Sequence, residues 1–434
     1  MRTSRVLLAT AALVLAAVAF SPAGTSSLGV DGGANAYPSL AAHGRDAVIV
    51  WGVSHSAGGS GIYVAVSRDS GRTFSAPRRV NDETTLANLA GEQPPRVSLA
   101  PREHGDPELI VVWTSRGSEG TRLVSARSGD MGVTFSPAED VPGSVAPGNR
   151  GWHATASDGA SRAFVFWLDH RETAPAPGSA PAGSHQHGAH AMPVRDGVAR
   201  AQLSKLFVAT LDGEVSGTPV TGGVCYCCKT ATAIGADGAV YAAWRHVYPG
   251  NLRDIAFTMS TDAGRTFSPP SRVSEDGWVL DGCPENGPSL AVARDGRVHI
   301  VWPTLVDMDE PGQEPTMALF YATSTDGRSF TERERIPTEG FPRHPQVALG
   351  ASGDLVVAWD EQDARGRRVA AAIGRPDEAG RVRFRRRAAA DSGAYPAVAA
   401  MDSGSLVAWT SGNGDSTMIR VERMPLREVR ATEW

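Results

Sequence analysis

The chain has 434 residues and a net charge of -5, with 41% hydrophobic and 21% charged residues. The charges are spread without long runs, which argues against a nucleic-acid partner, because such a partner requires a basic patch. The 48 glycines and 29 prolines, with few helix-type windows, are typical of a fold with many short strands and turns.

The first 24 residues have the three-part layout of a secretory signal. Two arginines precede an apolar run of about fifteen residues, and small residues follow it. No later segment approaches the roughly 20 apolar residues that a membrane helix needs, so we expect no membrane insertion. We therefore expect a signal peptide at 1–24 and an exported mature chain at 25–434, in the periplasm or outside the cell.

Short strands that end in tryptophan recur along the mature chain. The tryptophans are Trp51, Trp113, Trp167, Trp244, Trp302, Trp359 and Trp409. A companion strand and a turn precede each of them, which indicates a hairpin, and a third strand follows most of them. Units of about sixty residues with four strands match the blades of a propeller. We predict a single all-β domain, a β-propeller of four-stranded blades, with seven blades favoured and six as the alternative.

A second motif appears after the third strand of several units. It reads S-R-D-S-G-R-T-F from Ser67, S-G-D-M-G-V-T-F from Ser128, S-T-D-A-G-R-T-F from Ser260, and one residue shorter, S-T-D-G-R-S-F, from Ser324. The aspartate can accept backbone N–H bonds across a tight turn, glycine supplies a positive φ, and the phenylalanine can pack between neighbouring sheets. The motif resembles the Asp-box, or bacterial neuraminidase repeat, of the sialidase-like superfamily. At the level of repeats this resemblance covers nearly all of residues 37 to 426.

Loops of a propeller blade alternate between two faces, because its strands run outward from a central channel. The loop that leads into the innermost strand, here called the inner loop, shares a face with the loop that follows the tryptophan strand. Propeller ligands usually bind on that face. The charged and histidine side chains that we expect there are His153, Asp169, His170, Arg171, Lys229, Arg245, His246, Arg253, Asp254, Glu285, Asn286, Arg343 and His344.

The resemblance to sialidases implies three arginines on a substrate carboxylate, a tyrosine nucleophile assisted by a carboxylate, and an aspartate as acid and base. By their face, the best matches are Arg245, Arg253 and Arg343, with Tyr248 as nucleophile and Asp254 or Glu285 handling protons. Further candidates for substrate contacts are Lys229, Asn286, His153 and Asp169.

The first blade departs from the family pattern. Its inner loop, A-N-A-Y-P, has no arginine, and the loop after Trp51 has no carboxylate that could serve as the acid. Whether the chain is an enzyme, of exo-α-sialidase type if it is one, therefore stays open. The leading hypothesis is a protein that binds, and as an enzyme would hydrolyse, acidic glycans at the rim of blades three to six. Another small-molecule ligand on the same rim, or a protein partner on a scaffold, is an alternative.

Three of the four cysteines, Cys225, Cys227 and Cys228, stand in the inner loop of the fourth blade. The other, Cys283, stands in the inner loop of the fifth blade. Export favours disulfides, and the least strained pairing joins Cys225 to Cys228 and Cys227 to Cys283. Either this bracing or a metal site would lie at the expected functional rim.

The alternative is a metal site that uses the four cysteines with His153 or His344. Thiolates suit soft ions, so the ion would be copper or zinc, although the sequence requires no cofactor. A loop inserted at about 172–200 is rich in Pro, Gly, Ala and Ser, which predicts a flexible solvated segment. It also carries side chains of metal-ligand type, namely His185, His187, His190 and Met192.

Overall fold

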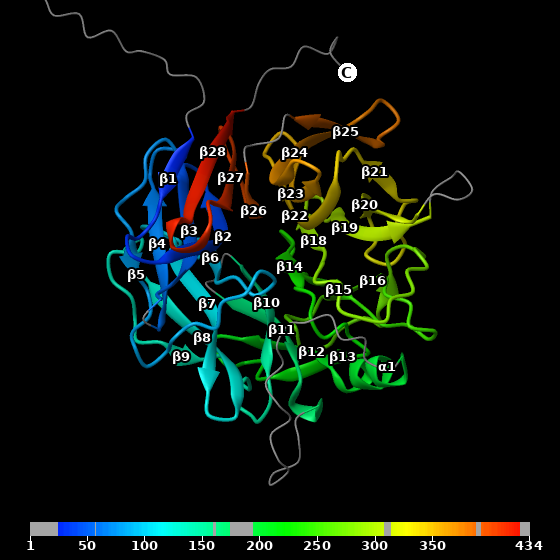
Figure 1. Ribbon diagram of the computed structural model, residues 1–434, viewed down its shortest axis with the longest axis horizontal. Helices are drawn as coiled ribbons and strands as arrows, with labels where there is room; N and C mark the ends of the chain where they lie inside the picture. Colours follow the sequence, from blue (N-terminus) through cyan, green and yellow to red (C-terminus); the bar gives the residue numbers. More distant parts are fainter. Residues whose placement is uncertain are drawn as a thin grey trace, which may run out of the picture.

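The computed structural model of the protein describes residues 25–56, 58–158, 162–173, 194–307, 314–387 and 392–425. These residues form seven four-stranded antiparallel sheets, which are arranged around a central axis (Figure 1). The predicted β-propeller with seven blades is confirmed, and the alternative of six blades is wrong. The proposed signal peptide, residues 1–24, lies outside the described residues.

Each of the first six blades is built from strands that follow one another in the chain, from the innermost to the outermost. Blade 1 holds β2 (Ala34–His43), β3 (Asp46–Ser54), β4 (Ser60–Ser67) and β5 (Arg78–Arg79). Blade 2 holds β6 (Arg96–Ala100), β7 (Glu108–Gly117), β8 (Gly120–Ser128) and β9 (Glu139–Asp140). Blade 3 holds β10 (Arg150–Ser157), β11 (Ala163–Asp169), β12 (Lys205–Thr210) and β13 (Thr218–Gly222).

The second half of the chain repeats this order. Blade 4 holds β14 (Ala231–Ile234), β15 (Val240–Arg245), β16 (Ile255–Ser260) and β17 (Ser271–Arg272). Blade 5 holds β18 (Ser289–Val292), β19 (Val298–Val306), β20 (Thr316–Ser324) and β21 (Glu334–Ile336). Blade 6 holds β22 (Phe341–Leu349), β23 (Leu355–Asp363), β24 (Gly366–Pro376) and β25 (Val382–Arg387).

Blade 7 closes the ring with strands from both ends of the described chain. It holds β26 (Ala394–Met401), β27 (Gly404–Ser411), β28 (Met418–Pro425) and, as its outermost strand, β1 (Ser26–Leu28). Figure 1 shows β1 in blue directly beside β28 in red. The antiparallel pairing of Ser26 with Val421 therefore ties the first strand to the last blade.

Helix is confined to short pieces. The 3-10 helices η1 (Arg171–Thr173) and η2 (Gly414–Ser416) are single turns, and α1 (Val194–Leu203) leads into β12. The predicted loop at about 172–200 therefore ends in a helix. Its candidate metal ligands, His185, His187, His190 and Met192, lie outside the described residues. Within the described part of the chain, no helix has the length and apolar composition to cross a membrane.

The blades pack on one another through the seven tryptophans. Each tryptophan is at most 3% exposed, and each stands in the second strand of its blade. Trp302 of blade 5, for example, packs with Phe257 of blade 4 in one apolar cluster. Burying a ring of this size against the neighbouring sheet contributes several kcal/mol, roughly 1.5–3 for each large side chain. The repeated tryptophan is therefore a packing residue of the fold.

The Asp-box turns fold as the sequence predicts. In blade 2, Oδ1 of Asp130 accepts the backbone N–H groups of Val133 and Thr134, at 3.1 and 2.9 Å, and Oδ2 accepts the hydroxyl of Thr134. Gly132 supplies the positive φ, at 80°. In blade 4 the terminal Phe267 packs edge-on against Phe166 of blade 3, with ring centroids 5.7 Å apart. These turns therefore brace the sheets from outside the channel.

Strand register places the Asp-box turns and the inner loops at opposite ends of each blade. In blade 1, Ala34 pairs with Ser54 and Ser54 pairs with Ser60, at the end where the inner loop lies. At the other end, Ala47 pairs with Ser67, the first residue of the Asp-box. The inner loops and the ends of the tryptophan strands consequently share one face, as expected.

Candidate functional site

The innermost strands of four blades carry the same irregularity where they begin. In β2, Tyr37 and Pro38 together lie opposite Trp51 alone, which is a β-bulge. The same arrangement occurs in β10, β22 and β26, each time opposite the tryptophan of the blade. The first residue of each bulge has a left-handed backbone, which is strained for a residue with a side chain. These residues are Tyr37 (φ 60°), Trp152 (53°), His344 (50°) and Tyr395 (52°).

The bulges surround one end of the central channel, here called the channel mouth. Two residues from the innermost strand of every blade, such as Ser39 and Leu40 of β2, line a cavity of about 180 Å³ in the channel. Tyr37, His344 and Tyr395 line a smaller hollow beside it. Because drug-sized ligands occupy roughly 300–1,000 Å³, a ligand as large as an oligosaccharide would lie across the mouth rather than inside the channel.

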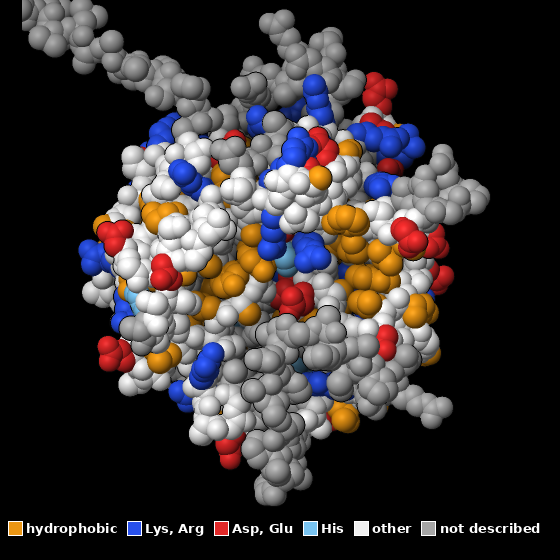
Figure 2. Space-filling model, in the orientation of Figure 1, with side chains coloured by type: hydrophobic (Ala, Val, Ile, Leu, Met, Phe, Trp, Pro, Cys, Tyr) orange, Lys and Arg blue, Asp and Glu red, His pale blue; other side chains and the backbone are white. Residues whose placement is uncertain are grey.

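Positively and negatively charged side chains lie close together near the propeller axis. Figure 2 shows Lys and Arg in blue, Asp and Glu in red, and His in pale blue around the centre of the face in view, with hydrophobic patches to either side. A surface that mixes charged groups with apolar flanks suits a ligand that is itself polar at some positions and apolar at others.

His344 lies between two carboxylates at the channel mouth. Its Nδ1 is 2.8 Å from Oδ1 of Asp360, and its Nε2 is 3.9 Å from Oε1 of Glu92. The imidazole is 6% exposed, and its ring lies 4.5 Å from that of Tyr395. A histidine held by one carboxylate, with its other nitrogen facing a second, can accept or release a proton without leaving its place.

Asp360 is the anchor of this cluster. Its carboxylate is paired with Arg367 and accepts the backbone N–H of Tyr395 at 3.1 Å. Burial on its own would raise the pKa of Asp360, but the charges and hydrogen bonds of His344 and Arg367 hold that pKa below its ordinary value. Asp360 is therefore an anion that fixes the positions of its three partners.

Two tyrosines complete the hollow. The rings of Tyr37 and Tyr395 meet edge to face with centroids 4.9 Å apart, and the guanidinium of Arg367 lies 4.5 Å from the Tyr395 ring. Burial, together with the neighbouring Tyr395, raises the pKa of Tyr37. Both phenols come from bulges, so the strained backbone positions them at the mouth.

Glu92 and Lys229 connect this cluster to blades 4 and 5. Oε2 of Glu92 accepts the backbone N–H groups of Lys229 and Gly287, at 2.7 and 3.0 Å, while its Oε1 is buried with no hydrogen-bond partner. The ammonium of Lys229 donates to the carbonyls of Gly287, Pro288 and Pro345. Burial lowers the pKa of Lys229 to about 8. Lys229, predicted as a substrate contact, thus ties three inner loops together.

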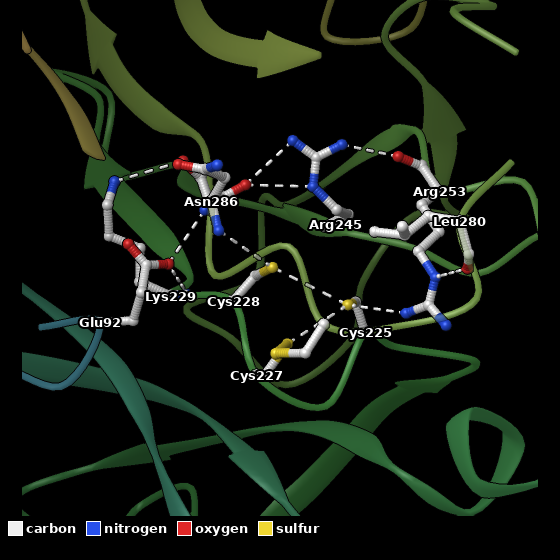
Figure 3. The surroundings of a disulfide bond; sticks show 11 residues. Glu92, Cys225, Cys227, Cys228, Lys229, Arg245, Arg253, Leu280 and Asn286 are labelled. Carbon is white, nitrogen blue, oxygen red and sulfur yellow. Dashed lines mark hydrogen bonds between the residues drawn. A yellow bond between two sulfur atoms is a disulfide. The ribbon is translucent and has the colours of Figure 1, made fainter. Parts of the chain in front are cut away.

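Cys225, Cys227 and Cys228 lie close together in the inner loop of blade 4 (Figure 3), and Cys283 joins them from the inner loop of blade 5. Cys227 and Cys283 form a disulfide with their Cα atoms 6.1 Å apart. The second expected bond, Cys225–Cys228, is not formed, and these two cysteines are free thiols with their sulfur atoms 3.8 Å apart. The sulfur of Cys225 also lies 3.9 Å from that of Cys227. Three sulfur atoms from one loop are therefore neighbours.

The hydrogen bond from Cys228 and the charges of Arg253 and Arg245 lower the pKa of Cys225 to about 6, although burial opposes the shift. Nη1 of Arg253 donates to the Cys225 sulfur at 3.0 Å. Burial, together with the Cys225 sulfur, raises the pKa of Cys228. The pair thus holds one thiolate and one thiol near neutral pH.

Arg245 and Arg253 lie beneath the surface rather than on it. Arg245 is 1% exposed, and its guanidinium donates only to the backbone carbonyls of Arg253, Asn286 and Pro303. Arg253 is fully buried and donates to the carbonyl of Leu280 as well as to Cys225. Because these bonds occupy the guanidinium groups, neither arginine is free to hold a substrate carboxylate in this geometry.

The residues of blade 4 that were predicted to transfer protons also contact other side chains of the protein. Asp254 is fully buried and paired with Arg272. The ring of Tyr248 lies under the same guanidinium, 4.6 Å away, and burial raises the pKa of Tyr248 to about 12. A nucleophile would need a lower pKa, so this arrangement favours a structural role for both.

Two further candidates are buried in blade 3. His153 is fully buried, its Nε2 contacts the carbonyl of Val112 at 3.1 Å, and burial lowers the pKa of His153 to about 3. Asp169 accepts the indole N–H of Trp167 and pairs with Arg150. His153 thus links blade 3 to blade 2, whereas Asp169 holds residues of its own blade.

Of the three remaining candidates, two lie at the surface and one is buried. Arg343 and Glu285 are exposed, and Glu285 has a positive φ of 48°. Asn286 is buried and accepts the backbone N–H of His344 through its Oδ1, at 3.3 Å. Arg343 thus stands next to the His344 cluster, while Asn286 supports it from the neighbouring loop.

Sequence reasoning missed Tyr37, Glu92, Asp360, Arg367 and Tyr395. Tyr37, Glu92 and Tyr395 stand in inner loops that were assigned to the correct face, and Asp360 directly follows the tryptophan of its blade, but other charged and histidine side chains stood out there. Arg367 lies in β24, which sequence reasoning did not assign to that face. A usable signal was the dipeptide of an aromatic residue or histidine followed by proline, which recurs as Tyr37-Pro, His344-Pro and Tyr395-Pro.

No protein-family model matches this chain, and no curated protein matches it. Solved structures resemble it at low identity. An α-L-arabinofuranosidase from Fusarium graminearum, in complex with an iminosugar inhibitor, has 11% identity and a TM-score of 0.52 over 93% of this chain and 98% of its own. An ulvan lyase, bound to a glucuronic acid and sulfated rhamnose unit, has 11% identity and a TM-score of 0.54 over 92% and 96%.

An α-L-arabinanase from Penicillium chrysogenum, complexed with arabinobiose, has 12% identity and a TM-score of 0.50 over 93% of this chain and 100% of its own. At these identities the likeness shows that the propeller fold is shared. What these three enzymes act on is a property of those enzymes and not of the fold.

Proposed function

We propose that this protein is an exported propeller that binds an acidic glycan across the channel mouth, with His344 at the centre of the site. The observation that carries the proposal is the position of His344 between Asp360 and Glu92, beside the tyrosines of two bulges. The shared fold with three glycan-acting enzymes supports the class of ligand. The proposed site is centred on blades 1, 6 and 7, and it shares blade 6 with the rim of blades three to six expected from the sequence.

The chemistry of the mouth suits a sugar that carries a carboxylate or a sulfate. Tyrosine rings, here Tyr37 and Tyr395, offer flat apolar faces with a polar tip, which stack well on sugar rings. Arg343 is exposed beside them and can form a bidentate pair with an anionic group. The ligand would thus be held by stacking and by charge.

The same groups could move a proton if the protein is an enzyme. His344, held by Asp360, is the candidate base, and the phenol of Tyr395 is the candidate acid, because both border one hollow. Arg367, a partly buried arginine that pairs with Asp360, keeps this carboxylate ionised. This arrangement suits cleavage beside a sugar carboxylate as well as hydrolysis, so the proposal covers glycan processing and does not specify sialosides.

The test is a panel of purified glycans assayed for binding by calorimetry and for cleavage by chromatography. The panel contains ulvan, a polyuronate, a sialoside and neutral arabinan. We expect binding of at least one acidic member and weaker binding of arabinan. Tyr395→Ala and Arg343→Ala should each weaken binding at least about tenfold, which corresponds to about 1.4 kcal/mol.

Arg265→Ala is the matched control, since Arg265 is an exposed arginine on an Asp-box turn at the opposite face. His344→Asn tests the proton-transfer role, because asparagine tolerates a positive φ. It should abolish cleavage while leaving part of the binding. Absence of binding to every acidic glycan by the folded wild-type protein would reject the proposal.

A further inference from the structure

The sulfur atoms of Cys225, Cys227 and Cys228 form a triangle of the size that a three-coordinate metal requires. All three lie within 4.8 Å of one another, and two of the separations are 3.9 and 3.8 Å. A metal ion at about 2.3 Å from each of three sulfurs in a plane holds the sulfurs about 4 Å apart. The loop therefore already has the spacing of a thiolate site.

The positive charges around the three sulfur atoms also favour a thiolate site. Arg245 and Arg253 are buried, and within the described residues neither has a carboxylate as ion-pair partner, since their guanidinium groups contact backbone carbonyls, the Cys225 sulfur and Asn251. A buried cation without a counter-ion is costly. Thiolates at the cysteines would supply the missing negative charge.

Neighbouring groups hold the sulfur atoms in place. The backbone N–H of Asn286 points at the Cys228 sulfur at 3.4 Å, and Arg253 donates to the Cys225 sulfur (Figure 3). Ala201 of α1 and Val247 pack against the three cysteines in one apolar cluster. Donors to the ligand atoms and a dry surrounding are the features that tune a metal site.

The ligand set identifies the class of ion. Sulfur-only ligands select soft ions. Among the described residues, the group of sulfurs within 4.8 Å of one another contains three members and not the sulfur of Cys283, which is bonded to Cys227 alone. Three sulfurs suit Cu(I) better than Zn(II), which is almost always four-coordinate in structural sites. His153 and His344, considered from the sequence as further ligands, do not belong to this group. The first contacts the carbonyl of Val112 and the second contacts Asp360.

We propose that Cys225, Cys227 and Cys228 bind one Cu(I) ion once the Cys227–Cys283 disulfide has been reduced. The reductant is a dithiol. It transfers two electrons and two protons to the two sulfur atoms, the S–S bond breaks, and the dithiol becomes a disulfide. Cys283, which is exposed, is the sulfur that a reductant can reach first. Binding of Cu(I) then displaces protons from the thiols as the metal–sulfur bonds form.

The experiment is a competition between the full mature protein and a chromogenic Cu(I) chelator, with native mass spectrometry for stoichiometry. Protein reduced with dithiothreitol and then desalted without oxygen should bind one Cu(I), whereas protein with the disulfide intact should not. Cys283→Ser keeps the three ligands and cannot form the disulfide. It should therefore bind one Cu(I) without any reductant, with the affinity of the reduced wild type.

Variants of the site separate it from other copper ligands of the chain. Cys225→Ser and Cys228→Ser should lose the stoichiometric ion, and Arg253→Met, which removes a donor to a ligand, should weaken binding by about 10- to 100-fold. Near-ultraviolet circular dichroism shows which variants fold. If a serine variant fails to fold, X-ray absorption of Cu(I)-loaded Cys283→Ser reads the number of sulfur ligands directly.

Three results would overturn the proposal. The first is a folded Cys283→Ser protein that takes up no stoichiometric Cu(I). The second is equal copper binding by Cys225→Ser and the wild type, which would place the ion on histidines. The third is a stoichiometric Zn(II) ion that Cu(I) does not displace.

Discussion

The indole N–H of Trp302 donates a hydrogen bond of 2.7 Å to Oδ2 of Asp276. Asp276 stands in the segment that joins blade 4 to blade 5, and its other oxygen is paired with Arg333. The bond therefore fixes the segment between two blades to the core of the second. The corresponding indole of Trp409 is buried without a partner, so one fold contains both versions of the same contact.

Comparison of Trp302 with Trp409 shows how much the indole hydrogen bond contributes to the free energy of unfolding. Trp302→Phe leaves the buried side chain of Asp276 without one donor, whereas Trp409→Phe removes an indole that had no bond. We expect Trp302→Phe to cost about 1–3 kcal/mol more in the free energy of unfolding, from urea titrations. Equal losses in the two variants would mean that the bond contributes nothing beyond packing.

Closure of the ring depends on Asn35. Its Oδ1 accepts the indole N–H of Trp51 at 2.9 Å, and its Nδ2 donates to the carbonyl of Thr417 in blade 7 at 3.0 Å. Asn35→Ala leaves several of these groups buried and unpaired, so we expect a loss of about 3 kcal/mol in urea unfolding. Asn413→Ala, an exposed helix-capping position without a side-chain bond, is the control and should change stability little.

Buried histidines make the fold sensitive to acid. Burial lowers the pKa to about 3 for His153 and to about 4 for His170, His246 and His299. Because these pKa values are lower in the folded than in the unfolded chain, the unfolded chain binds more protons as the pH falls from about 6.5. Stability is therefore fully present above about pH 6.5 and is lost as the pH falls towards 4.

Each such histidine should contribute a slope of about 1.4 kcal/mol per pH unit to the free energy of unfolding. Urea unfolding between pH 7 and 5 measures the slope. His299→Gln should reduce the slope by the contribution of one histidine. A slope that is unchanged in this variant would contradict the assignment of His299.

The Asp-box carboxylates act at lower pH. The hydroxyl of Thr266 is the main cause that lowers the pKa of Asp262 to about 2. Since the folded pKa lies below the unfolded one, this stabilisation is present above about pH 4 and is lost as the pH falls towards 2. A carboxyl titration followed by NMR should give the low value.

Two substitutions test whether the negative charge of Asp262 stabilises the fold more than that of an aspartate in an ordinary turn. Asp262→Asn should lower the melting temperature at pH 7 more than Asp295→Asn does, because Asp295 has a turn bond to the N–H of Arg297 but no Asp-box partner. The difference should shrink as the pH falls towards 2, because the Asp262 carboxylate takes up a proton in that range. A difference that does not shrink there would show that charge is not the cause.

The sequence by itself determined that the chain repeats a four-stranded blade, and it favoured seven blades over six. Each second strand carries a tryptophan, and each Asp-box carries an aspartate. These residues make contacts within one blade or with a neighbouring blade, so the pattern repeats at short range along the chain. The same regularity predicted which loops share a face, because strand direction alternates within a blade. It also brought Cys283 to the cysteines of the preceding blade.

Only the tertiary structure decided which of the polar residues on that face are free to act. Arg245, Arg253 and Lys229 are residues of the types that hold a substrate carboxylate. Each of them, however, is buried and donates hydrogen bonds to backbone carbonyls of other residues. Burial depends on contacts among inner loops of several blades, and no local pattern encodes it. The bulges that position His344 and Tyr395, and the unpaired charge that surrounds Cys225, arise from the same long-range packing.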